Sequence, residues 1–207
     1  MLAKFPGTAW QFLRPGKRVV WEYLTAARTL LFRNRAVHWR RVATGGVPPW
    51  DARNQLIAAA IPDNSSVVDL GCGAQTLRHY LRPGCTYKGF DLVANLPSVE
   101  FCDLNAGVYP RIETVADYVV CSGLLEYIFR PPELLSRIGI LGRTVCLSYN
   151  ALIPGETKRS RLAKAWVNHI TQTELEQMFT DLDFTWRVIT IRPPSEVIYM
   201  LARKGQR

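Results

Sequence analysis

Residues 66–73, Ser-Val-Val-Asp-Leu-Gly-Cys-Gly, constrain the fold of this chain more than any other segment. The two valines begin a short apolar run, which is typical of a strand buried on both faces. Asp69 ends this run, and Gly71 and Gly73 follow at an i, i+2 spacing that lets the backbone turn tightly beside a ligand. Residues 76–81 then have apolar side chains at helical spacing. The segment therefore predicts a strand, a glycine turn and a helix at the edge of a parallel sheet.

The spacing of the glycines separates two classes of cofactor. The dinucleotide pattern G-x-G-x-x-G requires glycine at position 76, where this chain has Thr76. Asp69-Leu-Gly-Cys-Gly instead resembles the D-x-G-x-G opening of class I S-adenosylmethionine-dependent methyltransferases. The resemblance implies a Rossmann-like three-layer α/β sandwich, whose mostly parallel seven-stranded sheet ends in an antiparallel hairpin. It also implies that Asp69 holds the amino-acid end of the cofactor, although Gln75 stands where the family often has glycine.

Three more strand-like segments follow in the order that the family uses. The expected strand within residues 87–92 ends in an acid, Asp91, which lies where such folds place a carboxylate that binds the ribose hydroxyls. Asp103 ends the segment 99–104 and resembles the family's contact to the adenine amino group, and residues 116–128 resemble a strand that runs into a loop facing the cofactor. The cofactor-binding residues that these matches imply are Asp69, Gly71, Cys72, Gly73, Asp91, Leu92, Asp103, Leu104, Cys121 and Ser122.

Glu126, Tyr127 and His169 are the candidate catalytic residues. An oxygen or nitrogen acceptor with a high pKa needs a base to remove its proton before methyl transfer. Glu126 follows the fourth strand, where the family often contacts cofactor and acceptor, and Tyr127 stands where histidine is common. His169 belongs to residues 151–170, which we expect to be an insertion that covers the acceptor. Structural roles remain open for each: a helix cap or salt bridge for Glu126, packing for Tyr127, and exposure for His169.

The remaining pattern completes one methyltransferase domain over residues 48–207. The length of 207 residues and the hydrophobic content of 48% suit a single sizeable core. We expect one helix over 50–61, with Leu56, Ile57 and Ala60 on one face, and a second helix over 131–141. A third helix should follow the capping box at Thr171–Glu174. We also expect a strand over 144–149 and a hairpin formed by 184–191 and 196–202.

Cysteine and hydropathy patterns limit the setting of the protein. Five cysteines, an odd number without paired spacing, favour reduced thiols in the cytoplasm. The cysteines and histidines show no metal-ligand spacing, so we expect no metal. Residues 1–16 lack the pattern of a signal peptide, and no segment has the length and hydropathy of a transmembrane span.

Residues 1–47 form a separate basic arm. The first 50 residues hold nine basic side chains and one acid, which account for +8 of the formal net charge of +9. Residues 18–37 have helical periodicity, with an apolar stripe of Val20, Leu24, Ala27 and Leu31. The stripe suits packing on the domain, docking on an anionic membrane through residues 10–41 (a peripheral position on the inner face), or, less favoured, binding of nucleic acid.

We therefore expect an S-adenosylmethionine-dependent methyltransferase that acts on a small-molecule, glycan or lipid-linked acceptor, with oxygen favoured as the acceptor atom. An RNA or protein methyltransferase is the first alternative. Cys121-Ser-Gly-Leu stands where amino-methylating nucleic-acid enzymes carry an Asn-Pro-Pro-Tyr type of motif. A non-catalytic subunit that binds the cofactor is the second alternative, and the presence of three strand-end acids argues against it.

Overall fold

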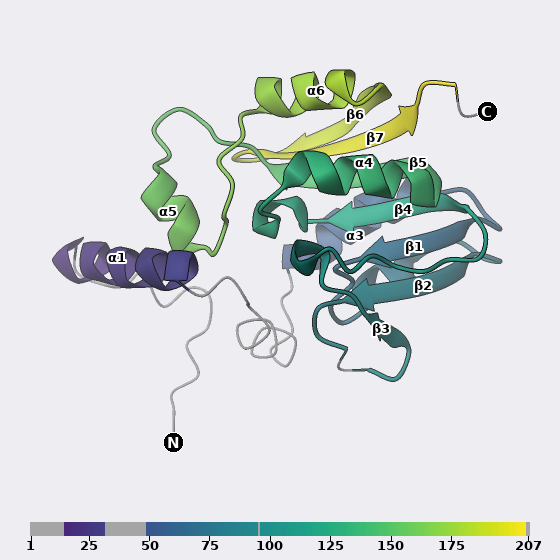
Figure 1. The fold of residues 1–207 in the computed structure, drawn as a ribbon, viewed down its shortest axis with the longest axis horizontal. Helices are drawn as coiled ribbons and strands as arrows, with labels where there is room; N and C mark the ends of the chain where they lie inside the picture. The colour runs from purple at the N-terminus through teal and green to yellow at the C-terminus, as the bar shows by residue number, and fades with distance from the viewer. Residues whose placement is uncertain (1–14, 32–48, 95, 206–207) are drawn as a thin grey trace.

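A seven-stranded sheet organises the chain, with the strand order β3-β2-β1-β4-β5-β7-β6 (Figure 1). The computed structural model describes residues 15–31, 49–94 and 96–205. Strands β1 to β5 pair in parallel, and β7 is antiparallel to both of its neighbours. The expected fold class and the terminal hairpin are thus confirmed. The strands are β1 Ser66–Leu70, β2 Thr86–Asp91, β3 Val99–Phe101, β4 Ala116–Ser122, β5 Gly142–Asn150, β6 Phe184–Arg192 and β7 Glu196–Arg203.

Helices cover both faces of the sheet because successive strand residues point to opposite sides. Val67 and Val120 pack in one apolar cluster with helix α3, whereas Val68 and Val119 pack in a second cluster with helices α4 and α6. The three layers of the expected sandwich are therefore α3, the sheet, and α4 with α6 (Figure 1). These helices span Pro49–Ala59 (α3), Pro131–Leu141 (α4) and Gln172–Asp181 (α6).

The predicted capping box begins α6. The Thr171 hydroxyl accepts a hydrogen bond from the backbone N–H of Glu174 at 3.2 Å, and the Glu174 carboxylate accepts one from the Thr171 N–H at 2.8 Å. Both N–H groups would otherwise lack a partner at the helix terminus. The reciprocal bonds hold the start of α6 in place, and Leu175 and Phe179 are consequently directed into the core.

The buried face of α3 differs from the one expected. Ile57 is buried, but Leu56 is exposed, and the helix turns Arg53 and Asn54 inward instead. Asn54, Ile57 and Ala58 follow an i, i+3, i+4 spacing, so two polar residues continue the apolar face. They are polar because this end of α3 borders a cavity and not the apolar core.

The segment after the glycine turn forms the short 3₁₀ helix η2 (Thr76–Tyr80), where the sequence predicted a helix over residues 76–81. Leu77 is buried as expected, whereas Tyr80 and Leu81 are only partly buried. Gln75 precedes η2 in a left-handed conformation, and Pro83 disfavours helical geometry in the residue before it. Too few residues remain between these two points for a longer α-helix.

Helix α1 (Pro15–Leu31) lies against the short helix α5 (Lys158–Ala163) at one end of the molecule (Figure 1). Of the three alternatives for its apolar stripe, packing on the domain is contradicted for the described residues, because Val20, Leu24 and Leu31 are exposed. The arm's other aromatic and basic positions, including Trp10, Phe12, Phe32 and Trp39, lie outside the described residues. Within the described ranges, no helix has both the length and the apolar character needed to cross a bilayer.

Candidate active site

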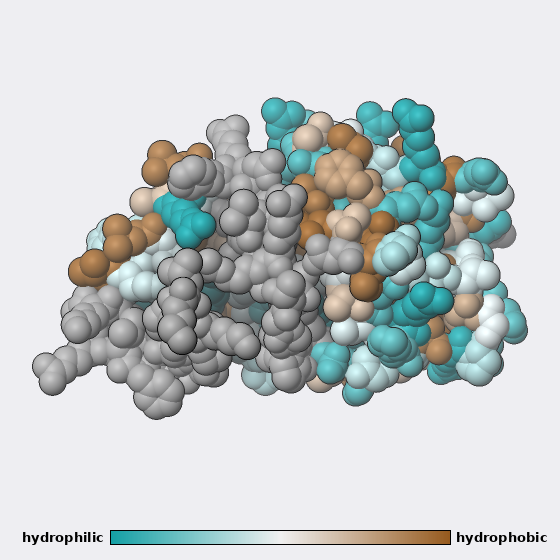
Figure 2. All heavy atoms as spheres, turned by 90° about the horizontal axis from the view of Figure 1, so that it is seen from below, coloured by the Kyte–Doolittle hydropathy of each residue, from teal (hydrophilic) through white to brown (hydrophobic). Residues whose placement is uncertain are grey.

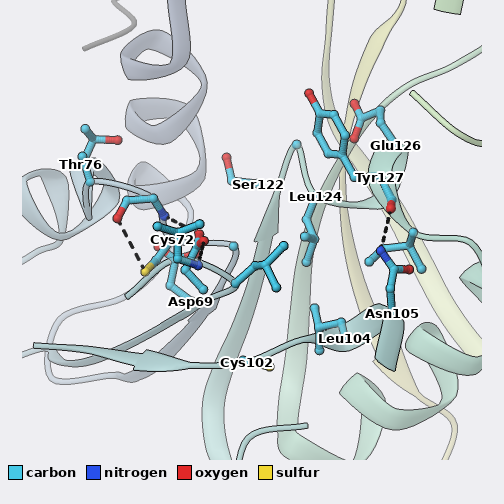
Figure 3. A pocket seen from close by; sticks show the side chains of 18 of the residues that line it. Asp69, Cys72, Thr76, Cys102, Leu104, Asn105, Ser122, Leu124, Glu126 and Tyr127 are labelled. Atoms are coloured by element: carbon cyan, nitrogen blue, oxygen red, sulfur yellow. Dashed lines mark hydrogen bonds between the residues drawn. The ribbon is translucent and has the colours of Figure 1, made fainter. Parts of the chain in front are cut away.

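A cavity of about 220 Å³ opens at the carboxyl ends of the parallel strands (Figure 3). Ligands in open α/β sheets bind at this edge, where the strand order reverses between β1 and β4. Nine of the ten expected cofactor-binding positions line the cavity, namely Asp69, Gly71, Cys72, Gly73, Asp91, Leu92, Asp103, Leu104 and Ser122. The strand tips thus bring together residues that are up to 53 positions apart in the sequence, between Asp69 and Ser122.

Both glycines of the turn adopt a positive φ, a backbone conformation that favours glycine. Gly71 has a φ of +72°, and an added Cβ would come within 2.9 Å of Leu124. Gly73 has a φ of +52°, with no other atom within 4 Å of the place where a Cβ would be. A side chain at Gly73 would therefore extend into free space beside the cavity, where a ligand can approach the peptide.

Asp91 ties the second strand to the glycine turn. Its carboxylate accepts hydrogen bonds from the N–H groups of Gly73 and Val93, each at 2.9 Å. Burial raises the pKa of the Asp91 carboxyl, and these backbone bonds oppose the rise. The expected ribose ligand is thus a fixed carboxylate at the cavity wall.

Asp69 is a buried carboxyl with one oxygen in use. Its Oδ2 accepts a 2.7 Å hydrogen bond from the Tyr87 hydroxyl, whereas Oδ1 has no partner among the described residues. Burial raises the pKa of Asp69 to about 7, with a further rise from Asp91 and opposing effects from Tyr87 and Arg53. An unpaired buried oxygen is costly, so Oδ1 is suited to a cationic hydrogen-bond donor from a ligand.

Asp103 and Leu104 form the third corner of this wall. Asp103 caps the short 3₁₀ helix η3 (Leu104–Ala106) by accepting a hydrogen bond from the Ala106 N–H at 3.1 Å. Asn105, which also lines the cavity, donates to the carbonyl of Tyr127 at 2.9 Å (Figure 3). The loop after β3 is therefore fixed to the loop after β4 across the cavity.

Sequence reasoning missed a polar network behind Ser122. Arg53 donates to the Ser122 hydroxyl at 2.7 Å and forms a buried ion pair with Glu196 at 2.9 Å. The Ser122 hydroxyl donates to Asn54 at 2.7 Å, and Asn54 donates to Thr76 at 2.6 Å. The sequence feature that could have indicated this network is Asn54, a polar residue three positions before the buried Ile57 and therefore on the same face of α3. This network joins α3, β4, η2 and β7 around the cavity.

Glu126 and Tyr127 both line the opposite wall, as expected for candidate catalytic residues. Glu126 is 1% exposed, and its Oε1 accepts hydrogen bonds from the backbone and side-chain nitrogens of Asn150 at 2.9 and 2.8 Å. Its Oε2 has no partner among the described residues. The Tyr127 hydroxyl accepts a 3.2 Å hydrogen bond from the indole of Trp166, which the sequence analysis did not single out. Figure 3 shows Glu126 and Tyr127 together on the loop after β4.

Two predicted site residues lie elsewhere. Cys121 is fully buried in the core cluster of α4 and α6, because alternation along β4 turns it away from the cavity. His169 is not among the residues that line the cavity. Its Nδ1 is buried without a partner in the described part of the chain, and burial beside Arg161 and Lys158 lowers its pKa. Cys72 lines the cavity, but burial raises the pKa of its thiol, which suits packing.

A buried arginine holds the expected acceptor-covering segment against the sheet. Arg161 is 0% exposed, pairs with Glu156 at 2.8 Å, and donates to the Tyr149 hydroxyl at 3.0 Å and the Asn150 carbonyl at 2.7 Å. Its guanidinium lies 4.8 Å from the centre of the Trp166 ring. Trp166 consequently keeps its place in the cavity wall through cation–π contact as well as through Tyr127.

The sequence and the fold match known methyltransferases. A family profile described as "Methyltransferase domain" matches residues 47–187. The chain belongs to this methyltransferase-domain family, and it is a class I S-adenosylmethionine-dependent methyltransferase, as the resemblance of its motifs implied. Among curated proteins, none is close enough in sequence to match.

Solved structures share the fold at low sequence identity. A putative O-methyltransferase from Nostoc punctiforme superposes with a TM-score of 0.63 at 12% identity, over 89% of this chain and 71% of that one. Human N-acetylserotonin methyltransferase, in complex with S-adenosylmethionine, superposes with a TM-score of 0.59 at 15% identity, over 82% of this chain and 55% of that one. The 1,6-didemethyltoxoflavin-N1-methyltransferase of Burkholderia thailandensis, with bound S-adenosylhomocysteine, superposes with a TM-score of 0.57 at 17% identity. The match covers 97% of this chain and 93% of that one.

The cavity suits S-adenosylmethionine, which is the cofactor of this class. The cofactor carries an ammonium and a sulfonium, and three carboxyl groups line the wall built by β1, β2 and β3. The unpartnered Oδ1 of Asp69 can accept from the ammonium, and the open space at Gly73 leaves room for the ligand. Asp69, Gly73, Asp91 and Asp103 are thus the residues that would hold it.

Proposed function

We propose that this methyltransferase acts on a hydroxyl group of a small-molecule acceptor, free or attached to a glycan or lipid. The observation that carries the proposal is the Oε2 atom of Glu126, a buried carboxylate oxygen at the cavity wall without a partner among the described residues. A hydroxyl is a weak nucleophile, and a carboxylate within reach can remove its proton as the new bond forms. The two Asn150 hydrogen bonds to Oε1 fix the orientation of this base.

The reaction requires little further covalent chemistry from the protein. S-adenosylmethionine supplies, when bound, a methyl group on a cationic sulfur. The acceptor oxygen would take this methyl group in place of the sulfur, and Glu126 Oε2 would receive the hydroxyl proton. Tyr127 and Trp166 form an aromatic wall that excludes water and orients the acceptor.

Two features favour a small acceptor over RNA or protein. Residues from seven separate segments of the chain line the cavity, and its acceptor side has aromatic walls that suit a compact apolar or planar group. The Burkholderia and human neighbours are named for small-molecule acceptors, which supports the same class here at the level of analogy. All five cysteines are free thiols within the described residues, which supports a cytoplasmic setting for the activity.

A methyl-transfer screen tests the proposal. The purified chain is incubated with methyl-labelled S-adenosylmethionine and with sets of phenols, alcohols, glycans, RNA and protein, and the products are analysed by mass spectrometry. Transfer to a small hydroxyl compound would support the proposal, whereas transfer only to RNA, protein or nitrogen would contradict it. Tight binding of S-adenosylhomocysteine without transfer to any acceptor would favour the non-catalytic subunit.

The Glu126→Gln variant tests the base itself. Glutamine keeps an oxygen for the Asn150 bonds but removes the proton acceptor, so we expect kcat to fall by about 10²–10⁴-fold. S-adenosylhomocysteine affinity should not change. Glu133→Gln is the matched control, because the Glu133 side chain is 60% exposed on α4. A kcat near that of the wild type in Glu126→Gln would exclude Glu126 as the base.

A further inference from the structure

Helix α1 uses its polar face to contact the rest of the protein. The Thr29 hydroxyl donates to the Leu162 carbonyl of α5 at 2.8 Å. Arg159 of α5 forms an ion pair with Glu22 at 3.3 Å and donates to the Tyr23 hydroxyl at 2.9 Å. The small residue Ala26 is buried in the same contact. The inward face of α1 is therefore made of polar and small side chains.

The outward face of α1 is apolar, which is the reverse of a typical surface helix. Val20 is 58% exposed, Leu24 67% and Leu31 76%, and their i, i+4, i+11 spacing places them on one face. Trp21, Tyr23 and Leu30 flank this stripe and are also exposed. Figure 2 shows apolar side chains at the left-hand edge of the molecule, where α1 lies in Figure 1.

We propose that this outward face, defined by Val20, Leu24 and Leu31, docks on the surface of an anionic lipid bilayer. Arg28 is an exposed cation on the same helix, and Lys158 is exposed at the start of the adjoining α5. The first 50 residues carry +8 of the formal charge. A helix that combines aliphatic and aromatic side chains with cations is attracted to anionic headgroups and inserts its apolar face at the headgroup–acyl boundary.

Two other occupants fit the charges and the stripe less well. A second copy of the chain would bring another net charge of +9 and another basic helix to the interface, and the like charges would repel. A nucleic acid would contact the cations but would leave Val20, Leu24 and Leu31 without apolar partners. A bilayer satisfies both features. The 17-residue helix is about 25 Å long, which suits a position parallel to the membrane plane.

This membrane contact is independent of the acceptor that the enzyme uses. It does adjoin the active site along the chain, because α5 contacts α1 and leads directly to Trp166 in the cavity wall. An acceptor carried on a lipid would therefore meet the enzyme on its membrane-facing side. The docking surface and the methyl-transfer chemistry can be tested separately.

Vesicle sedimentation with the full chain tests the proposal. We expect binding to phosphatidylcholine vesicles that contain about one-third phosphatidylglycerol, weaker binding as salt rises, and little binding to phosphatidylcholine alone. The double variant Leu24→Glu, Leu31→Glu should lower the partition coefficient by about tenfold or more. Phe101→Glu is the control, since Phe101 is 60% exposed on β3 in the catalytic domain and should leave binding unchanged.

The outcomes separate the possible occupants. Equal binding to both vesicle types, or wild-type binding by the double variant, would overturn the proposal. A wild-type dimer that the double variant converts to a monomer, without vesicle binding, would assign the face to a second copy. RNA binding without vesicle binding would assign it to nucleic acid. Arg28→Glu provides a second test, because it should weaken vesicle binding while the thermal unfolding midpoint stays unchanged.

Discussion

The two walls of the cavity are built in different ways. The cofactor wall consists of strand tips and the turns that directly follow them, and Asp69, Gly71 and Gly73 lie within five consecutive residues. The acceptor wall combines Tyr127 and Trp166, whose contact spans 39 positions. Local backbone geometry shapes the first wall, whereas long-range side-chain contacts assemble the second.

This difference has a consequence for stability and for specificity. The cofactor wall is part of the sheet, so it can change only if the sheet changes. The acceptor wall depends on a few polar contacts around Arg161, which can be lost while the sheet remains. We therefore expect perturbations of the two walls to separate in experiments, with different effects on the fold, on the cofactor and on the acceptor.

The largest expected effect comes from Arg161→Ala. The substitution leaves Glu156 without its 2.8 Å partner and removes the donors to Tyr149 and Asn150. Because all of these groups are largely buried, we expect the free energy of unfolding to fall by about 3 kcal/mol. Urea unfolding measures the change, and methyl transfer should be lost through displacement of Trp166.

The same variant tests the independence of the two walls. S-adenosylhomocysteine affinity, measured by calorimetry at a temperature where the variant is folded, should stay within about twofold of the wild type. Arg159→Ala is the matched control, since the Arg159 side chain is 35% exposed and its loss should lower the free energy of unfolding much less than the loss of Arg161. A parallel collapse of cofactor affinity in Arg161→Ala would show that the walls act as one unit.

Asp91→Ala should produce the opposite pattern. The cofactor would lose a charged acceptor, and Gly73 and Val93 would lose the partner of their N–H groups. We expect S-adenosylhomocysteine binding to weaken by about 1–3 kcal/mol, or roughly 5- to 150-fold. Calorimetry measures this change, with the exposed Asp63→Ala as control. An unchanged affinity would remove Asp91 from the cofactor site.

The contrast between the walls also explains what the sequence could predict. Strand, turn and acid form a local pattern, so the sheet, the glycine turn and the convergence of Asp69, Asp91 and Asp103 were all accessible from the sequence. Cys121 was misplaced within that pattern because its orientation depends on the register of β4 relative to the two helix layers. A shift of one residue along a strand exchanges the two faces.

Long-range contacts were not accessible in the same way. Nothing in the local sequence indicates that Trp166 reaches Tyr127 or that Arg161 is fully buried, because both depend on how residues 151–170 return to the sheet. The periodicity of α1 correctly gave an apolar stripe at Val20 and Leu24. Periodicity defines the faces of a helix, but it does not say which face meets the protein.

Asp69 predicts a pH dependence that belongs to the cofactor wall. Its pKa of about 7 lies above the ordinary value of 3.8, so the protonated form is favoured below about pH 7 in the folded protein without ligand. The carboxyl thus contributes stability that is fully present below about pH 4 and is lost as the pH rises to about 7. A ligand ammonium favours the ionised form instead.

Cofactor affinity should therefore increase as the pH rises toward about 7, by at most tenfold per pH unit, and then level off. Calorimetry with S-adenosylhomocysteine across this range measures the effect. Asp69→Asn should flatten the profile and release no proton on binding, which buffers of different ionisation enthalpy can detect. A profile that stays steep in Asp69→Asn would assign the titration to another group.

The smallest expected effect concerns Gln75, where the cofactor wall departs from the family pattern. Gln75 has a φ of 59°, the left-handed conformation that favours glycine, and its buried side-chain amide bonds to the Ser98 hydroxyl at 3.0 Å. Gln75→Gly would relieve about 1 kcal/mol of backbone strain. It would also lose a hydrogen bond of similar value, and glycine would raise the entropy of the unfolded chain, which destabilises the fold. We expect a net destabilisation within about 1 kcal/mol.

Gln75→Ala keeps the strain without the bond, so its unfolding free energy should be the lower of the two. Urea unfolding of both variants and of Ser98→Ala would measure the compensation. A Gln75→Ala variant as stable as the wild type would mean that the bond to Ser98 does not offset the strain. Gln75 does not line the cavity, so cofactor affinity should remain constant across the series and restrict the effect to the fold.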